Sequence, residues 1–149
     1  MSQIDKTNSI RNFRIKSQYI FSLAIEKVKE IRNKEKSEDI KKYYSYVRAL
    51  PSLIINNGLI GTLLFYKSKR ETVYNSIIYI LTEIFKPYKD FSQNNKYNKS
   101  QSENDNDLLL DYISGLDSNM LRLLTNEVLL ISLYLKRVVE ALLKEDIKE

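Results

Sequence analysis

Glycine and proline are scarce in this chain, and their scarcity constrains the fold more than any other feature of the sequence. Only 3 of the 149 residues are glycine and 2 are proline. Both residue types punctuate helices and form turns, so their low number favours long helices over a turn-rich β fold. The length fits a single domain, residues 1–149, that can bury a real hydrophobic core.

Apolar residues recur at helical spacing along six segments of the chain. We expect helices at about 9–33, 37–49, 51–67, 71–85, 108–115 and 117–144. Ser37 is predicted to cap the second helix, and Asp117 or Ser118 the last one. The last helix has a heptad seam, which we expect to pack inside its own domain rather than against another chain. The seam residues are Leu121, Leu124, Val128, Ile131, Leu135, Val138 and Leu142.

The segment 51–67 is the most apolar in the chain and leaves little polar face. A helix that is apolar nearly all round is buried, so this segment is predicted to be the central helix. Pro51 is expected to end the helix before it and to begin this one. The pair Asn57-Gly58 allows two interpretations: a continuous helix, which we expect, or a break at this pair.

Residues 91–107 are rich in Asn and Ser and offer almost nothing to bury. They are predicted to form a polar flexible loop after Pro87 ends the preceding helix. The predicted fold is therefore an all-α, single-domain bundle of about six helices, with a buried central helix and a long C-terminal helix.

The composition also excludes most kinds of chemistry. The chain has no Cys and no His, so thiol nucleophiles, thiolate metal sites and the usual proton-transfer side chain are missing. Phosphate-binding glycine loops and nucleophile elbows are absent too. We predict no enzymatic activity, no cofactor and no metal site. No apolar run approaches the roughly 18 residues of a membrane span, and the N-terminus lacks a signal peptide's apolar stretch, so a cytoplasmic protein without membrane contact is expected.

Charge is distributed unevenly along the sequence. The formal net charge is +5, but residues 1–70 carry 15 Lys and Arg against 6 Asp and Glu, whereas residues 71–149 carry 9 against 13. A basic half suits a polyanion, and an acidic half suits a basic protein neighbour.

Several groups of cations are candidates for binding RNA phosphates. The strongest is the turn Lys67, Lys69 and Arg70, which follows the most apolar segment and is therefore presented by a rigid scaffold. The other candidates are Lys136, Arg137, Arg14, Lys16, Lys41 and Lys42. For each of them the alternative is a solvated surface cluster. Tyr43, Tyr44 and Tyr66 lie beside cations and could stack bases, although a place at the edge of the core is the more common role of Tyr.

Two stretches of the sequence resemble a known family. The first, from Tyr46 to Lys69, has a Leu-Pro pair, an aliphatic run, Gly58-Leu59, and an aromatic followed by Lys-x-Lys. The second contains Thr125-Asn126-Glu127 and continues through Tyr134 to Arg137. Both resemble the small α-helical subunit of the type III-B CRISPR (Cmr) RNA-silencing effector complex, and the resemblance covers most of residues 10–145.

The resemblance implies a non-catalytic structural subunit in antiviral defence. Copies of such a subunit stack along the backbone filament and help bind guide and target RNA through a basic face. The implied partners are the backbone and large subunits of the complex, guide RNA, target RNA and copies of the chain itself. The cations that match the family's motifs are Lys67, Lys69, Lys136 and Arg137, and Arg70 is added on charge alone.

Two other functions remain open. A helical adaptor could mediate protein–protein assembly without direct RNA contact, using the heptad seam and the acidic half as its interface. A helix-turn-helix DNA regulator could use the segment 51–67, but a recognition helix needs polar residues facing the groove, and this segment has few.

Overall fold

The structure is a computed structural model that describes the backbone of residues 2–98 and 107–147 and the side chains of residues 16–95 and 107–147. Within these ranges the chain forms seven α-helices and no strand, which confirms the all-α prediction. The helices are α1 (Ser2–Lys34), α2 (Ser37–Asn57), α3 (Leu59–Lys69), α4 (Glu71–Ile84), α5 (Lys86–Asn98), α6 (Leu108–Ser114) and α7 (Ser118–Leu142), followed by a short 3₁₀ helix, η2 (Glu145–Ile147).

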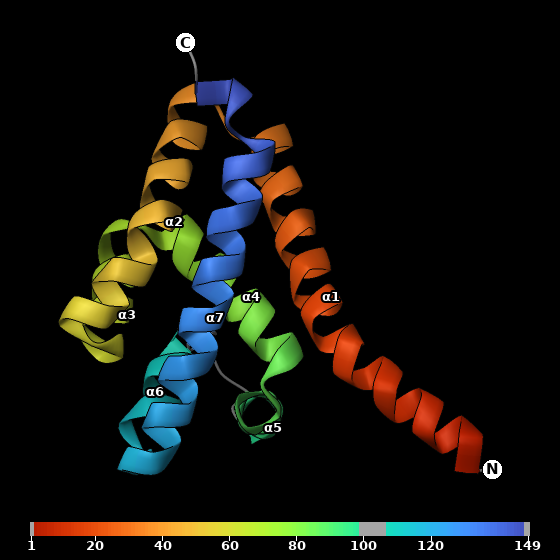
Figure 1. The fold of residues 1–149 in the computed structure, drawn as a ribbon. Coiled ribbons are helices and arrows are strands. Elements are labelled where there is room, and N and C mark those ends of the chain that lie inside the picture. Colours follow the sequence, from red (N-terminus) through yellow and green to blue (C-terminus); the bar gives the residue numbers. More distant parts are fainter. Residues whose placement is uncertain (1, 99–106, 148–149) are drawn as a thin grey trace.

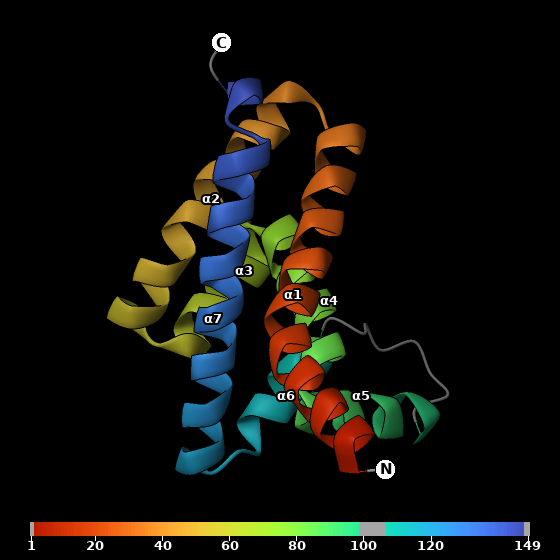
Figure 2. The same cartoon turned by 45° about the vertical axis from the view of Figure 1, so that its right-hand side comes forward.

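The long C-terminal helix α7 packs against α1 and α2, which lie on its two sides (Figure 1). The C-terminal ends of α1 and α7 meet the N-terminal end of α2 at one end of the bundle (Figure 2). Helix α4 crosses behind α7 and contacts α1, α2, α3, α5 and α7. Neither α7 nor any other described helix combines the length and apolarity that a bilayer span requires.

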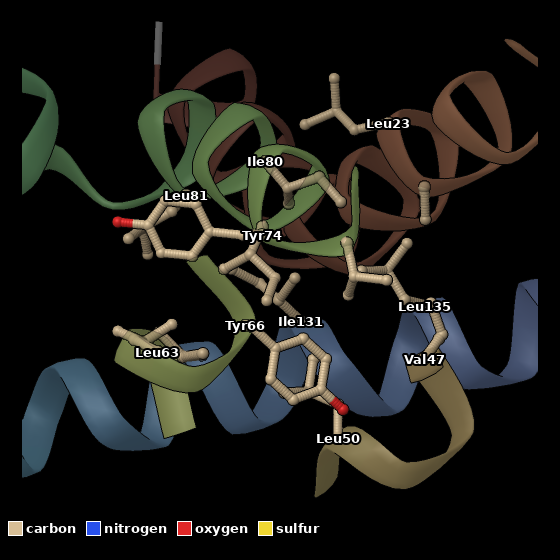
Figure 3. Packing of buried hydrophobic residues seen from close by; sticks show 14 of the residues in the cluster. Leu23, Val47, Leu50, Leu63, Tyr66, Tyr74, Ile80, Leu81, Ile131 and Leu135 are labelled. Carbon is tan, nitrogen blue, oxygen red and sulfur yellow. The ribbon is translucent and has the colours of Figure 1, made fainter. Parts of the chain in front are cut away.

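The buried central helix is α4, within the segment predicted at 71–85. Its residues Val73, Ile77 and Ile80 are fully buried. They belong to a single core cluster that draws on α1 to α7. Figure 3 shows α4 side chains packed among those of the neighbouring helices. The labelled ones are Tyr74, Ile80 and Leu81 from α4, with Leu23, Val47, Leu50, Leu63, Tyr66, Ile131 and Leu135 from the helices around it.

The prediction that segment 51–67 is the central helix is wrong. Ile55 is 69% exposed and Leu64 is 48% exposed. Helix α3 packs on α2 and α4 with one side only, so its remaining apolar side chains face outward. Apolarity all round usually means burial, and here it leaves an exposed apolar face instead.

The heptad seam of α7 lies inside the bundle, as predicted. Leu124, Val128, Ile131 and Leu135 are fully buried, and Val138 nearly so. These residues pack on α1, α2 and α4, while Leu121 and Leu142 at the two ends of the seam are partly buried against the same core. Asp117 caps the helix, because its Oδ1 accepts a hydrogen bond from the Met120 amide at 2.9 Å.

Pro51 does not end a helix, contrary to the prediction. Helix α2 runs through it, from Ser37 to Asn57. A proline inside a helix costs about 3 kcal/mol through its missing donor and its ring clash. Leu50 and Ile54 on either side of Pro51 are buried, and each contributes about 1.5–3 kcal/mol, so packing outweighs the local penalty.

The helix breaks instead at Gly58, the alternative that the sequence left open. Gly58 has φ +81° and ψ 164°, a backbone conformation that only glycine adopts readily. The chain turns back there, so that α3 packs on α2. The Thr62 hydroxyl donates to the carbonyl oxygens of Leu53 (3.0 Å) and Gly58 (2.7 Å) and ties the two helices together.

Two further details differ from the sequence prediction. Residues 91–98 are the second part of α5 and not loop, and Phe91 packs on the core, which explains why this stretch is ordered as a helix. The rest of the predicted loop up to residue 106 lies outside the described residues. The N-cap of α2 is Lys36 rather than Ser37, and the Lys36 side chain makes no capping hydrogen bond.

Candidate functional site

Three of the cations proposed from the sequence line one pocket. Lys42 of α2, Lys69 of α3 and Arg70 at the α3–α4 junction surround a half-open cavity of about 250 Å³, together with Tyr43 and Tyr46. We call this cavity the Arg70 pocket. The fold-back at Gly58 brings Lys69 and Arg70 to the start of α2, although almost thirty residues separate them from Lys42.

Arg70 is held in place by aromatic rings. Its Cζ atom lies 4.3 Å from the ring centroid of Tyr46, 4.8 Å from that of Phe65 and 5.0 Å from that of Tyr66. Its Nη1 donates to the Tyr66 hydroxyl at 3.0 Å, and that hydroxyl donates to the Tyr46 carbonyl oxygen at 2.6 Å. Guanidinium–ring stacking of this kind leaves an ordered cation, which loses less entropy when it binds an anion.

Burial raises the pKa of the two tyrosine hydroxyls next to the pocket, those of Tyr43 and Tyr66. Tyr43 is buried, its hydroxyl hydrogen-bonds that of Ser76 at 2.9 Å, and burial raises the pKa of Tyr43 to about 12. Burial also raises the pKa of Tyr66, although the hydrogen bond from Arg70 opposes the shift. Both side chains are therefore neutral parts of the core at physiological pH. Base stacking by Tyr43 or Tyr66 is excluded because neither ring reaches solvent.

Carboxylates also line the Arg70 pocket. They are Glu35 near the end of α1, Asp39 in the first turn of α2 and Glu71 in the first turn of α4. At those helix starts Asp39 and Glu71 complement the helix dipoles. The pocket itself is therefore balanced in charge, and its positive side is the one formed by α2 and α3.

After Asp39, the remainder of α2 and the whole of α3 contain no carboxylate. No Asp or Glu occurs between Asp39 and Glu71, whereas six Lys and Arg do. One of the six, Arg48, was not proposed from the sequence; its Nε donates to Glu140 of α7 at 3.2 Å, and its guanidinium stacks on Tyr44 at 5.3 Å. We define Lys42, Lys69 and Arg70, together with the surface of residues 40–70 beside them, as the basic face.

The remaining candidates are placed elsewhere or paired within the chain. Lys67 forms a salt bridge to Asp107 at 2.9 Å, and Lys16 forms one to Glu127 at 2.9 Å, so these two lysines join α3 to the start of α6 and α1 to α7. Lys41 is half-buried on α2. The side chain of Arg14 lies outside the described residues.

Lys136 and Arg137 lie on α7 and do not line the Arg70 pocket. Arg137 is exposed on the side of the helix away from the core, and Lys136 is half-buried. Lys42, Lys69 and Arg70 were thus predicted from the sequence as candidate binding residues. The role of Tyr46 and Phe65, whose rings order Arg70, was not predicted. Among the residues whose side chains are described, no group of three or more acidic side chains is arranged to hold a metal ion.

Comparison with known protein families finds a match. The family described as "CRISPR-associated protein (Cas_Cmr5)" matches residues 16–142. The chain belongs to the Cas_Cmr5 family. This is the family of the small helical subunit of the type III-B Cmr complex, a subunit that is generally non-catalytic. The match runs from α1 to the end of α7 and so includes the whole basic face of this Cas_Cmr5 protein. No curated protein and no solved structure matches the chain.

Proposed function

We propose that this Cas_Cmr5 protein is a non-catalytic structural subunit of a cytoplasmic type III-B effector complex and that it binds guide or target RNA through the basic face. Copies of it stack along the backbone filament, next to the backbone and large subunits, in antiviral defence. The observation that carries the RNA contact is the convergence of Lys42, Lys69 and the ring-ordered Arg70 on the segment 40–70, which contains no Asp or Glu. Lys and Arg side chains gathered in this way can neutralise RNA phosphates.

The alternative, an adaptor that only bridges proteins, loses the heptad seam, which is one of the two parts of the interface predicted for it. Its heptad seam is buried against α1, α2 and α4 and is unavailable to another chain. An adaptor would have to use exposed apolar residues such as Leu123 and Leu133 on the outer side of α7. Charge reversal on the basic face separates the two functions, because only the RNA-binding subunit depends on those cations.

The test is RNA affinity measured by fluorescence anisotropy of a short labelled RNA over a series of salt concentrations. The variant carries Lys42→Glu and Lys69→Glu, which lowers the net charge from +5 to +1. We expect the variant to bind RNA more weakly. The slope of log K against log salt concentration should also become shallower, by about 0.7 for each single-strand phosphate that the variant no longer neutralises. Binding at low salt that does not respond to this variant would refute RNA contact by the basic face.

The matched control carries Lys34→Glu and Lys86→Glu, which gives the same net charge. Both lysines are exposed, and each forms an (i, i+4) surface pair, with Glu30 and Asp90 respectively. The control should keep the salt slope of the unmodified protein, since it removes charge from α1 and α5 rather than from the basic face. An equal loss of affinity in both variants would point to overall charge instead of a site.

A further inference from the structure

A second cavity adjoins the basic face at the α2–α3 fold-back. It has a volume of about 250 Å³ and is lined by Leu53 and Asn57 of α2 and by Gly61, Thr62 and Phe65 of α3. We call it the Phe65 groove. Its two walls are tied together, because the hydroxyl of Thr62 in α3 donates to the backbone oxygen of Leu53 in α2 and to that of Gly58 at the break.

The lining of the Phe65 groove suits a flat, mostly apolar group that has polar edges. Phe65 is 43% exposed and supplies an aromatic ring, and Leu53 supplies apolar contact. Over Gly61 there is open space, since even a Cβ placed there would meet no atom within 4 Å. Asn57 is exposed at the mouth, and its amide offers both donors and an acceptor. A nucleobase is a group of this kind.

Phe65 connects the groove with the Arg70 pocket. The Arg70 guanidinium lies 4.8 Å from the centroid of the Phe65 ring, and Arg70 and Lys69 line the neighbouring cavity. An aromatic platform next to ordered cations is the arrangement by which proteins bind single strands, with the ring stacking a base and the cations holding the backbone.

The exposed Ile60 and Leu64 beside the groove would also suit a protein partner. Two observations favour RNA. The 40–70 segment that forms this surface has no Asp or Glu. The absence of negative charge favours a polyanion as the partner, whereas a protein partner does not depend on it. Phe65, which is exposed, is also one of the three rings that contact the pocket-lining Arg70.

We propose that the Phe65 groove binds one unpaired base of single-stranded RNA, stacked on Phe65 and hydrogen-bonded by Asn57, while Lys69 and Arg70 contact the adjacent phosphates. This inference rests on the proposed function, because it names the form of RNA that the basic face takes. A paired base has no free face to enter the groove, so the protein prefers a single strand to a duplex of equal length.

The chain has no Trp, so a single Trp introduced at the groove gives a specific optical signal. In the Phe65→Trp variant, a single-stranded oligouridine should quench Trp emission, with a midpoint equal to that of binding measured by anisotropy. A duplex of the same length should quench much less at equal occupancy. The control is Leu123→Trp, on the outer side of α7 and 53% exposed, whose emission should not change on binding.

A second variant, Phe65→Ala, separates stacking from an indirect effect on Arg70. Loss of base stacking should weaken single-strand binding by on the order of 10-fold and leave duplex binding unchanged. An equal weakening for both RNAs would mean that Phe65 only positions Arg70, and it would overturn the proposal. Asn57→Leu should lower single-strand affinity selectively in the same way. Circular dichroism verifies that each variant is folded.

The remaining outcomes are distinct. RNA binding that persists without quenching of the Phe65→Trp variant overturns the groove but leaves the proposed function intact. No RNA binding at low salt by the unmodified protein overturns both. If Phe65→Ala lowers the molecular mass measured by light scattering and leaves RNA affinity unchanged, the face is a protein interface and the proposal is wrong.

Discussion

Gly58→Ala tests the break between α2 and α3. Gly58 has φ +81° and ψ 164°, in a region that residues with a Cβ rarely enter. A Cβ at this position would meet no atom within 4 Å, so the cost is backbone strain alone and not a steric clash. Strain of this kind costs about 1–3 kcal/mol, so the free energy of unfolding should fall by about 2 kcal/mol. For a chain of this length the melting temperature should fall by roughly 4–8 °C.

The sign of the effect discriminates between the two interpretations that the sequence allowed. In a continuous helix Gly58→Ala would stabilise the protein by about 0.5–1 kcal/mol, because alanine is the better helix former. Urea unfolding monitored by circular dichroism measures the change. An increase in stability, or none, would refute the break.

Gly61→Ala is the matched control. Gly61 lies within α3, is exposed, and has open space where a Cβ would be added. Here alanine should raise the free energy of unfolding by about 0.5–1 kcal/mol. The two glycines are three residues apart, so opposite signs at these positions can arise only from their different backbone conformations.

Three further substitutions test the contributions of a core leucine, a helix cap and the buried Tyr43 hydroxyl to stability. Leu135→Ala in the buried seam of α7 should cost about 2–5 kcal/mol in urea unfolding, while Leu123→Ala, on a side chain 53% exposed, should cost much less. Asp117→Ala should cost about 0.5–2 kcal/mol, because it removes the oxygen that accepts from the Met120 amide. The pKa of Tyr43 rises from 10.0 to about 12 on burial, so its contribution to stability is complete below pH 10 and is lost as the pH approaches 12. Tyr43→Phe should reduce that alkaline loss, and a fall in stability above pH 10 as steep as in the unmodified protein would contradict the assignment.

The helices at 71–84 and 118–142 could be predicted from sequence because their apolar residues follow the helical period and face the core. Their boundaries depend on local signals, such as the Asp117 cap. Segment 51–67 could not be assigned correctly in the same way. Whether Pro51 ends a helix depends on burial of Leu50 and Ile54 against other elements, and no local rule contains that information.

The site was only partly predictable for a related reason. Lys69 and Arg70 stood out as a cluster beside an apolar helix. Their partners did not: Tyr46 lies more than twenty residues before Arg70, and nothing in the spacing indicates that its ring covers the guanidinium. Lys16 likewise pairs with Glu127, which is 111 residues away in the sequence. Contacts of this kind follow from the arrangement of helices and not from patterns along one of them.

Gly58 is the residue that creates both the fold-back and the site. A straight helix rises about 1.5 Å per residue, so in a continuous helix Tyr46 and Tyr66 would be about 30 Å apart. In the folded chain the Tyr66 hydroxyl lies 2.6 Å from the Tyr46 carbonyl oxygen, and Arg70 stacks on both rings. The ordered cation, the Arg70 pocket and the Phe65 groove therefore all require the turn at Gly58. A Gly58→Ala variant that relieves its strain by opening this turn should therefore bind RNA more weakly as well as being less stable. Leu135→Ala, compared at an equal folded fraction, should change stability alone.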